Sequence, residues 1–257
     1  MQEKIDIVIQ GGIWENTYFT AVEYLKLSFV NKIIISTWDY EKEKCSVYPN
    51  NDRIEYIFST PPEHDGGGNL NYQIISSSAG LKRSTTNVAI KARSDQTISL
   101  VDMEKLNVFY NKFHEDKEIF TLGIGTHFPY HPQDHFLWGN REDLINYFDL
   151  PFESADATYG PHTDFATNTL RGPIHLGVHY YARFSEVAKK HAANPKEYLL
   201  DAAPKIQEAF DEYNRIRSLG FKAFPRVTMQ WHKYGGVGYM YDMYGSQGEV
   251  YHDEAWE

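Results

Sequence analysis

Residues 66–95 read GGGNLNYQIISSSAGLKRSTTNVAIKARSD, and this stretch decides the fold class. A Gly-rich loop comes first, followed by a helix expected over residues 71–82, a short turn and an apolar strand over residues 87–92. Arg93-Ser94-Asp95 follows the strand directly. A helix that leads into a buried strand is typical of an α/β protein, in which ligands bind at the carboxyl ends of the strands.

Amide side chains and one carboxylate fall near the carboxyl end of this strand. Asn69, Asn71 and Gln73 lie at the start of the expected helix and can face one crevice. A carboxylate beside amides suits a nucleoside diphosphate held through a divalent metal, which prefers oxygen ligands. Taken alone, Asp95 is better explained as an ordinary turn-capping residue. The three amides upstream favour a ligand site instead.

Three further strands extend the α/β pattern toward the N-terminus. Short β-branched runs predict strands over residues 5–9, 32–36 and 53–58, and the spacing of apolar residues predicts a helix over residues 16–29. Strands that alternate with helices indicate a mostly parallel sheet with right-handed connections. We therefore expect a Rossmann-like α/β sheet flanked by helices.

The second half of the chain has a different pattern. Its tail, from residue 227 onward, is rich in Tyr, Trp, Gly and His, so we expect a helical and aromatic-rich C-terminal part. With no flexible linker in the sequence, we expect a single domain over residues 1–257. The other predicted elements are a strand over residues 120–125, an irregular loop over residues 151–173, and helices over residues 141–148, 177–190 and 198–219.

The composition of the chain argues against some classes of binding partner. The formal net charge is −10, which argues against nucleic acid or an anionic membrane as the main partner. Cys45 is the single cysteine, so no internal disulfide can form and a reducing compartment is expected. Neither a signal-peptide pattern nor an apolar run of about 18 residues is present. We expect a cytoplasmic protein, with room for contact with the inner face of a membrane.

The ends of the first two strands supply further candidates. Gln10-Gly11-Gly12 follows the first strand, and glycine there allows close approach of the backbone to a ligand. It is neither a GxGxxG fingerprint nor a GxxxxGK[ST] phosphate loop. Asp39 follows the second strand, where an acid can accept hydrogen bonds from a ribose or a base. A solvated loop position explains Asp39 equally well.

Acids and histidines in the second half have both functional and structural explanations. Asp134, at a loop before an apolar segment, suits a general base or a helix N-cap. The pattern HExxH is absent. Pro129 and Pro132 interrupt the set His127, His131 and His135, whose spacing of four would otherwise suit one helical face, so a zinc hydrolase is disfavoured. His232 is a candidate contact for a metal or a diphosphate, although a lone histidine is more often structural. No GxSxG pattern supports a serine nucleophile.

With these residues in view, the chain resembles a GT-A type glycosyltransferase, and more narrowly the WavE family linked to bacterial lipopolysaccharide synthesis. The resemblance covers about residues 5–150 and depends on the order and spacing of four pieces. These are IDIVIQGGI (5–13), IIISTWD (33–39), the stretch 66–95 quoted above, and QDHFLWGNREDL (133–144).

The resemblance implies a nucleotide-sugar donor, with a UDP-sugar expected, and Mn²⁺ or Mg²⁺ as the cofactor. It implies a glycan or lipid-linked acceptor in surface polysaccharide synthesis, inverting chemistry, a donor half over residues 1–100 and an acceptor half over residues 101–257. It is also compatible with a homo-oligomer.

The DxD motif of GT-A enzymes corresponds to Arg93-Ser94-Asp95, in which the first acid is missing. Asp95 remains as the implied metal ligand, with His232 as a further contact, and Arg93 is placed to neutralise phosphate directly. The other implied donor contacts are Gln10, Gly11, Asp39, Asn69, Asn71 and Gln73. The implied general base is Asp134, with Glu197 in reserve.

Two other classes of protein remain open on the sequence. A sugar nucleotidyltransferase also uses a parallel sheet and a metal, but it normally has a basic Gly-rich segment near the first strand, and Gln10-Gly11-Gly12 lacks the basic residue. A non-catalytic nucleotide-sugar-binding module is the other alternative, because one acid of the DxD motif is missing.

Overall fold

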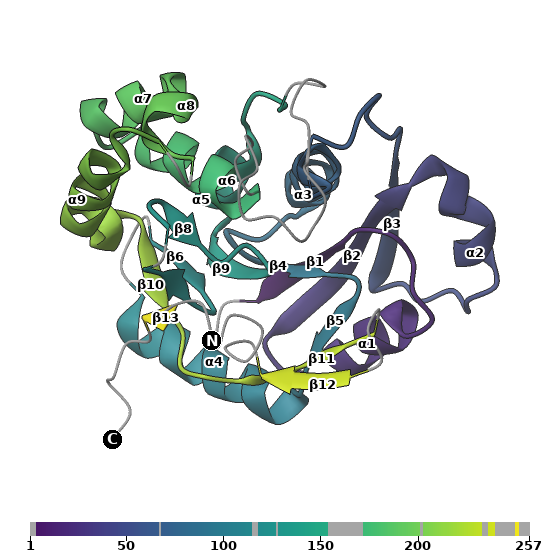
Figure 1. The fold of residues 1–257 in the computed structure, drawn as a ribbon. Helices are drawn as coiled ribbons and strands as arrows, with labels where there is room; N and C mark the ends of the chain where they lie inside the picture. The colour runs from purple at the N-terminus through teal and green to yellow at the C-terminus, as the bar shows by residue number, and fades with distance from the viewer. Residues whose placement is uncertain are drawn as a thin grey trace.

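A seven-stranded sheet in the order β10-β6-β9-β4-β1-β2-β3 forms the centre of the computed structural model (Figure 1). The structure describes residues 4–66, 68–114, 118–126, 128–153, 172–200 and 203–232, and the backbones of β12 and β13. The strands of this sheet are β1 (Ile5–Gln10), β2 (Val30–Trp38), β3 (Ile54–Ser59), β4 (Val88–Arg93), β6 (Ile119–Thr121), β9 (Phe136–Asn140) and β10 (Phe221–Ala223).

The sheet is mainly parallel, as the alternation of strands and helices predicted. β1 pairs in parallel with β2 and β4, β2 with β3, and β6 with β10. β9 is the exception, because it runs antiparallel between β4 and β6. The mixed α/β fold with a mainly parallel sheet is therefore confirmed.

Helices cover both faces of the sheet and enclose two apolar clusters (Figure 1). On one face lie α1 (Thr17–Tyr24) and α4 (Leu100–Phe113), which bury Tyr24 and Phe109 against the strands. On the other face the first helix is α3 (Leu70–Arg83), packed on β1 and β2. The remaining helices of that face are α5 (Arg141–Phe148), α6 (Gly172–Tyr181), α7 (Glu186–Ala193), α8 (Pro195–Tyr198) and α9 (Ile206–Ile216).

Short elements complete the described chain. They are η1 (Asp39–Glu41), α2 (Lys42–Ser46) and η2 (Arg217–Leu219), a sheet of β5 (Gln96–Ile98), β11 (Thr228–Trp231) and β12 (Gly236–Tyr239), and a sheet of β7 (Ile124–Gly125), β8 (His131–Pro132) and β13 (Val250–Tyr251). Within the described residues no helix is both long and apolar enough to cross a membrane.

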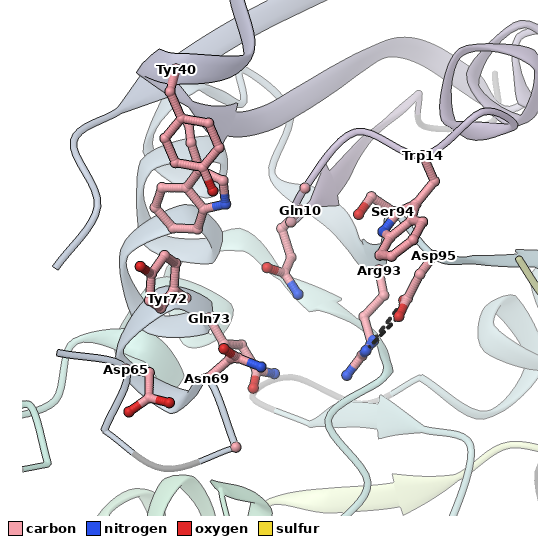
Figure 2. Close-up of a pocket in the computed structure, with 14 residues that line it drawn as sticks. Gln10, Trp14, Tyr40, Asp65, Asn69, Tyr72, Gln73, Arg93, Ser94 and Asp95 are labelled. Atoms are coloured by element: carbon pink, nitrogen blue, oxygen red, sulfur yellow. Dashed lines mark hydrogen bonds and ion pairs between the residues drawn. The ribbon is translucent and has the colours of Figure 1, made fainter. Parts of the chain in front are cut away.

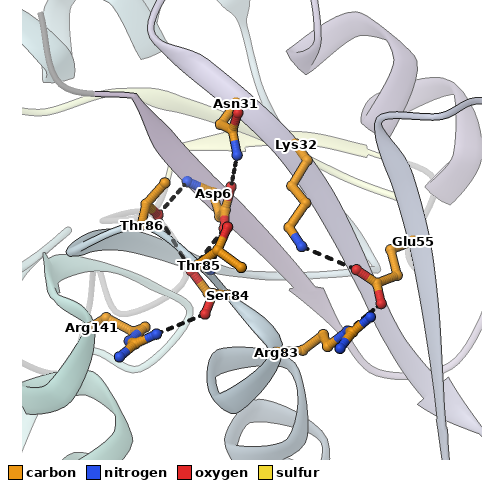
Figure 3. Close-up of polar contacts among 9 residues, drawn as sticks. All are labelled: Asp6, Asn31, Lys32, Glu55, Arg83, Ser84, Thr85, Thr86 and Arg141. Carbon is orange, nitrogen blue, oxygen red and sulfur yellow. Dashed lines mark hydrogen bonds and ion pairs between the residues drawn. The ribbon is translucent and has the colours of Figure 1, made fainter.

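A buried aspartate ties β1 to the turn that connects α3 with β4 (Figure 3). Asp6 is fully buried, and its Oδ2 accepts hydrogen bonds from Thr85 N at 2.7 Å and Ser84 Oγ at 3.0 Å. Its Oδ1 accepts from Asn31 Nδ2 at 2.8 Å. The helix itself packs closely on β1, since a Cβ at Gly80 would lie 2.4 Å from Val8 Cγ1. These contacts fix α3 on the sheet and so place its N-terminus at the strand ends.

Several predicted elements have different boundaries in the structure. The helix expected over residues 16–29 ends at Tyr24, because the chain then turns to bury Phe29 under Trp138 before β2. The strand expected over residues 120–125 is divided into β6 and β7, and Gly123 O between them accepts from Gln133 N at 2.9 Å.

The C-terminal helices are shorter than the sequence pattern predicted. The helix expected over residues 177–190 is two helices, because the Ser185 hydroxyl accepts from Ala188 N and begins α7 there. The helix expected over residues 198–219 is likewise divided between α8 and α9. Most of the loop predicted over residues 151–173 lies outside the described residues.

Candidate functional site

A cavity of about 490 Å³ opens at the carboxyl ends of β1 and β4, beside the N-terminus of α3 (Figure 2). This is the edge at which ligands bind in open α/β sheets. Its volume lies within the range of ordinary small-molecule sites, about 300–1,000 Å³. The lining residues are Gln10, Gly11, Gly12, Trp14, Trp38, Tyr40, Asp65, Gly68, Asn69, Tyr72, Gln73, Arg93, Ser94 and Asp95.

The loop after β1 forms the floor of the cavity and requires glycine. Gly11 has φ of +121°, and a Cβ there would lie 2.7 Å from Ser94 Oγ. Its amide donates to Ser36 O at 3.0 Å. Glu41, buried in η1, accepts hydrogen bonds from Ile13 N at 3.0 and 3.1 Å. The loop is therefore held by β2 and by the η1 turn that follows it.

Aromatic rings form one wall of the cavity (Figure 2). Trp38 ends β2 and meets Tyr72 of α3 edge to face, with ring centroids 4.7 Å apart. Tyr40 in η1 is 63% exposed, so its ring is available to a ligand. Trp14, from the loop after β1, lies on the opposite side near Arg93 and is 36% exposed. Exposed rings at a strand edge are suited to stack on a planar base.

An ion pair lies across the cavity from Tyr40 and Tyr72. Arg93 Nε donates to Asp95 Oδ1 at 2.9 Å, and its Nη2 donates to Oδ2 at 2.7 Å. The guanidinium also lies 5.5 Å from the centre of the Trp231 ring. Burial alone would raise the pKa of the Asp95 carboxyl, but the hydrogen bonds and charge of Arg93 outweigh it and hold that pKa below its usual range.

Buried polar residues lie beneath the cavity and contact its lining residue Gln73. Gln73 Nε2 donates to Asp134 Oδ2 at 2.6 Å, and Asp134 is 4% exposed. Lys91, fully buried in β4, donates from Nζ to the backbone oxygen of Asp134, and burial lowers its pKa to about 7. Burial, reinforced by the charge of Arg93, lowers the pKa of His135 to about 3. Asp134 is thus a partner of Gln73 and not a lining residue.

Six of the residues predicted from the sequence are brought together at the cavity. They are Gln10, Gly11, Asn69, Gln73, Arg93 and Asp95. Asn69 begins α3 in the left-handed conformation, with φ of 64°. Of the three amides expected at this edge, Asn69 and Gln73 line the cavity.

Asn71 and Asp39 point elsewhere. Asn71 is fully buried and holds the backbone of Glu153, accepting from its N at 2.9 Å and donating to its O at 3.0 Å. Asp39 does not line the cavity, and its Oδ2 accepts from Thr60 Oγ1 at 3.2 Å. The residues on either side of it, Trp38 and Tyr40, line the cavity instead.

Glu197 and His232 also lie outside the cavity lining. Glu197 is on α8, in the helical part of the protein, and pairs with Lys205 at 2.5 Å (Figure 1). His232 supports the site from behind, since its backbone N donates to Asp95 O at 2.9 Å. Its two ring nitrogens bond to Thr97 Oγ1 at 2.6 Å and Asn16 Nδ2 at 3.2 Å.

The aromatic rings and Asp65 were not among the residues predicted from the sequence. Trp38 ends β2, and Tyr40 and Trp14 lie shortly after β2 and β1, so their position relative to the strand ends was the available signal. Asp65 lies in the loop before α3, is exposed, and lies across the cavity from Arg93 (Figure 2). It followed Pro61-Pro62 in a segment with no regular pattern, and nothing in the sequence distinguished it.

The residues proposed to hold Mn²⁺ or Mg²⁺ do not fit a cation. In nucleotide sites such a cation is usually held by one or two carboxylates, together with waters and substrate phosphates. Both carboxylate oxygens of Asp95 are bonded to Arg93, and both ring nitrogens of His232 are engaged. Among the residues that the structure describes, no group of three or more His, Cys, Asp or Glu side chains could hold a metal ion.

Comparisons with known proteins add solved structures only. No protein-family model and no curated protein sequence matches the chain. The bifunctional IspDF from Campylobacter jejuni is 10% identical, with a TM-score of 0.40 over 61% of this chain and 45% of its own.

Two further solved structures are similar over the same share of the chain. The 4-diphosphocytidyl-2C-methyl-D-erythritol synthase from Anaerococcus prevotii is 10% identical, with a TM-score of 0.40 over 60% of this chain and 79% of its own. The CMP:2-keto-3-deoxy-manno-octonic acid synthetase complexed with CTP is 13% identical, with a TM-score of 0.37 over 60% of this chain and 80% of its own.

Proposed function

We propose that the cavity binds the nucleotide part of a nucleotide sugar, and that the protein is a glycosyltransferase of the kind its resemblance to the WavE family implies. One observation supports this above the others. The cavity at the carboxyl ends of β1 and β4 combines the exposed ring of Tyr40 on one wall with the guanidinium of Arg93 on the other. A planar base and a diphosphate need these two surfaces.

Each part of the donor has a candidate partner. Tyr40 is the exposed ring for the nucleobase, and Gly11 lets the backbone approach the ribose and phosphates closely. Arg93 is the only lysine or arginine among the described residues that line the cavity, so it is the candidate for the diphosphate. The sugar then extends toward Asp65 and Asn69 at the mouth of the loop before α3.

The proposed reaction is the transfer of the sugar to an acceptor hydroxyl. The acceptor oxygen attacks the anomeric carbon, and the bond between that carbon and the diphosphate oxygen breaks. Arg93 stabilises the negative charge that develops on the departing nucleoside diphosphate. Asp65 is the candidate base for the hydroxyl proton, because it is an exposed carboxylate on the cavity wall. Asp134, buried under Gln73, orients that amide in this scheme.

Nucleotidyl transfer is the second candidate. Arg93 occupies the position of the first acid of a DxD motif, and a nucleoside triphosphate would bind at the same sheet edge. Such a ligand carries more charge than a nucleotide sugar, and residues 10–14 after β1 contain no lysine or arginine to offset it. For this reason glycosyl transfer is preferred.

One experiment separates these functions. The melting temperature of the protein is measured with UDP-, GDP-, CMP- and TDP-sugars and with CTP and UTP, since a ligand at a hundredfold excess over Kd adds about 2.7 kcal/mol of stability. The stabilising ligand is then incubated with glycan acceptors or sugar phosphates. Release of a nucleoside diphosphate, or of CMP when the donor is a CMP-sugar, supports glycosyl transfer, and release of pyrophosphate from a nucleoside triphosphate supports nucleotidyl transfer. Binding without either product identifies a binding module, and no stabilisation by any nucleotide rejects the site.

A further inference from the structure

The Cα partners Gln10 and Arg93 end two neighbouring parallel strands, and both side chains line the cavity. Because residues in register on adjacent strands project from the same side of a sheet, an amide and a guanidinium are placed next to each other here. Figure 2 shows both groups directed into the same space. We propose that they form a phosphate clamp that holds the diphosphate of the nucleotide without a divalent cation. This inference rests on the proposed function.

Arg93 is oriented by an acid that is otherwise the natural metal ligand. Asp95 receives one N–H from Nε and one from Nη2, at 2.9 and 2.7 Å, and is 4% exposed. A guanidinium has five N–H donors in a rigid plane, so it can bind a carboxylate along one edge and a phosphate along another. Trp231 packs against the same guanidinium at 5.5 Å. Asp95 is therefore a positioning residue for Arg93.

Gln10 is oriented in the same way by a hydroxyl. Ser76 Oγ, buried on α3, donates to Gln10 Oε1 at 2.7 Å. This bond fixes the amide so that its oxygen faces α3 and its NH₂ group is directed to the cavity (Figure 2). The clamp thus consists of two nitrogen donors, each held by a second side chain, and an anionic oxygen is the ligand that such donors bind.

A divalent cation would compete with Arg93 for the same carboxylate. Each oxygen of Asp95 already accepts one N–H from Arg93, so a cation bound to the remaining lone pairs would lie beside the guanidinium. Two positive groups at that distance repel each other. The diphosphate charge is more simply offset by Arg93 itself.

The test is calorimetric titration of the full chain with UDP, and with inorganic pyrophosphate, in EDTA and in Mn²⁺. We expect a Kd in EDTA within about threefold of that in Mn²⁺. Arg93→Lys keeps the charge but loses the planar fork, and Gln10→Ala loses the amide. Loss of a hydrogen bond to a charged group should weaken binding about ten- to a hundredfold in both conditions. If the melting-temperature panel selects another base, GDP, CDP or TDP replaces UDP in the titration.

Two variants provide the controls. Arg83→Ala removes an exposed arginine at the far end of α3, where it pairs with Glu55, and should leave Kd unchanged (Figure 3). Asp95→Asn should weaken binding by the same factor with and without Mn²⁺. Melting curves of each variant confirm folding.

Three outcomes would overturn the clamp. Binding that requires Mn²⁺, together with an Asp95→Asn variant that no longer responds to Mn²⁺, would make Asp95 a metal ligand and leave the proposed function intact. Metal-free binding that is unaffected by Arg93→Lys and Gln10→Ala in folded protein would place the phosphates elsewhere. Failure of every nucleotide to bind in either condition would reject the proposed function and the clamp with it.

Discussion

Gln73 donates a 2.6 Å hydrogen bond to Asp134, a residue 61 positions later in the chain and almost fully buried. The bond joins the N-terminal turn of α3 to the segment before β9 directly beneath the cavity. In this buried position the Asp134 carboxylate accepts a hydrogen bond from Gln73 and does not line the cavity. Burial alone would raise the pKa of Asp134, but nearby charges and the Gln73 hydrogen bond hold it below its usual range, which makes it a weak base.

The first prediction concerns which acid acts as the base. In the glycosyl transfer proposed above, Asp65→Asn should lower kcat by about 10²–10⁴-fold while donor Kd is unchanged, because general-base catalysis contributes about that factor. Asp134→Asn should instead weaken donor binding, since Gln73 would then donate to a neutral amide oxygen in place of a carboxylate and would be held less firmly. Steady-state kinetics and calorimetry on both variants decide this. If Asp134→Asn lost kcat alone and Asp65→Asn were fully active, the roles would be reversed.

The second prediction concerns the nucleobase. Tyr40→Ala should weaken binding of nucleotides but not of inorganic pyrophosphate, because the exposed ring is proposed to stack on the base. Base–aromatic stacking is worth about 1–3 kcal/mol. Tyr40→Phe retains the ring and serves as the control, with Kd expected close to that of the unmodified protein. Equal losses for pyrophosphate and nucleotide would show that Tyr40 does not contact the base.

The third prediction concerns the floor of the cavity. Gly11→Ala should destabilise the protein by about 1–3 kcal/mol, because the backbone has φ of +121° and the new Cβ meets Ser94 Oγ. Urea unfolding measures the loss. In the double variant Gly11→Ala with Ser94→Ala, the clash is removed and only backbone strain remains, so part of the stability should return. No recovery would assign the whole cost to strain.

The fourth prediction concerns the buried aspartate that fixes α3. Asp6→Ala should lower the free energy of unfolding by about 2–4 kcal/mol, because Thr85 N and its neighbours lose their buried acceptor. Asp52→Ala, at an exposed position near β3, should change stability by less than about 0.5 kcal/mol. Chemical denaturation of both variants provides the comparison. Equal effects would mean that the Asp6 contacts add nothing to stability.

The fifth prediction concerns pH. Buried His135 has a folded pKa of about 3, whereas the unfolded residue takes up a proton near pH 6.5. Between these values the unfolded state binds more protons, so stability falls as pH falls, by about 1.4 kcal/mol per pH unit for this group. His135→Gln should therefore reduce the slope of unfolding free energy against pH between pH 4.5 and pH 6 by about that amount. An unchanged slope would mean that His135 is protonated in the folded protein.

Most of the central strands and one flanking helix could be predicted from local sequence patterns. The strands predicted over residues 5–9, 32–36 and 87–92 are confirmed, because apolar runs in the centre of a parallel sheet are largely buried on both faces and stand out in the sequence. The strand predicted over residues 53–58 is confirmed as the half-buried edge strand β3. The helix predicted over residues 71–82 is also confirmed, as α3, because helical spacing is a local pattern in the sequence. β9, by contrast, looks like any apolar segment, and its antiparallel pairing depends on β4 and β6, which are distant in the chain.

The sequence by itself determined the sheet, its mainly parallel pairing and the edge at which the cavity lies, because these depend on the spacing of apolar residues and on where each strand ends. Only the tertiary structure decided which polar residues near that edge face the cavity. Tyr40 lines it and the adjacent Asp39 does not, because the turn of η1 directs neighbouring side chains differently. Asp95 and Asp134 are both acids at strand edges, but neither has an uncommitted carboxylate. Asp95 pairs with Arg93, two residues earlier at the end of β4, and Asp134 accepts from Gln73, which the fold brings from α3.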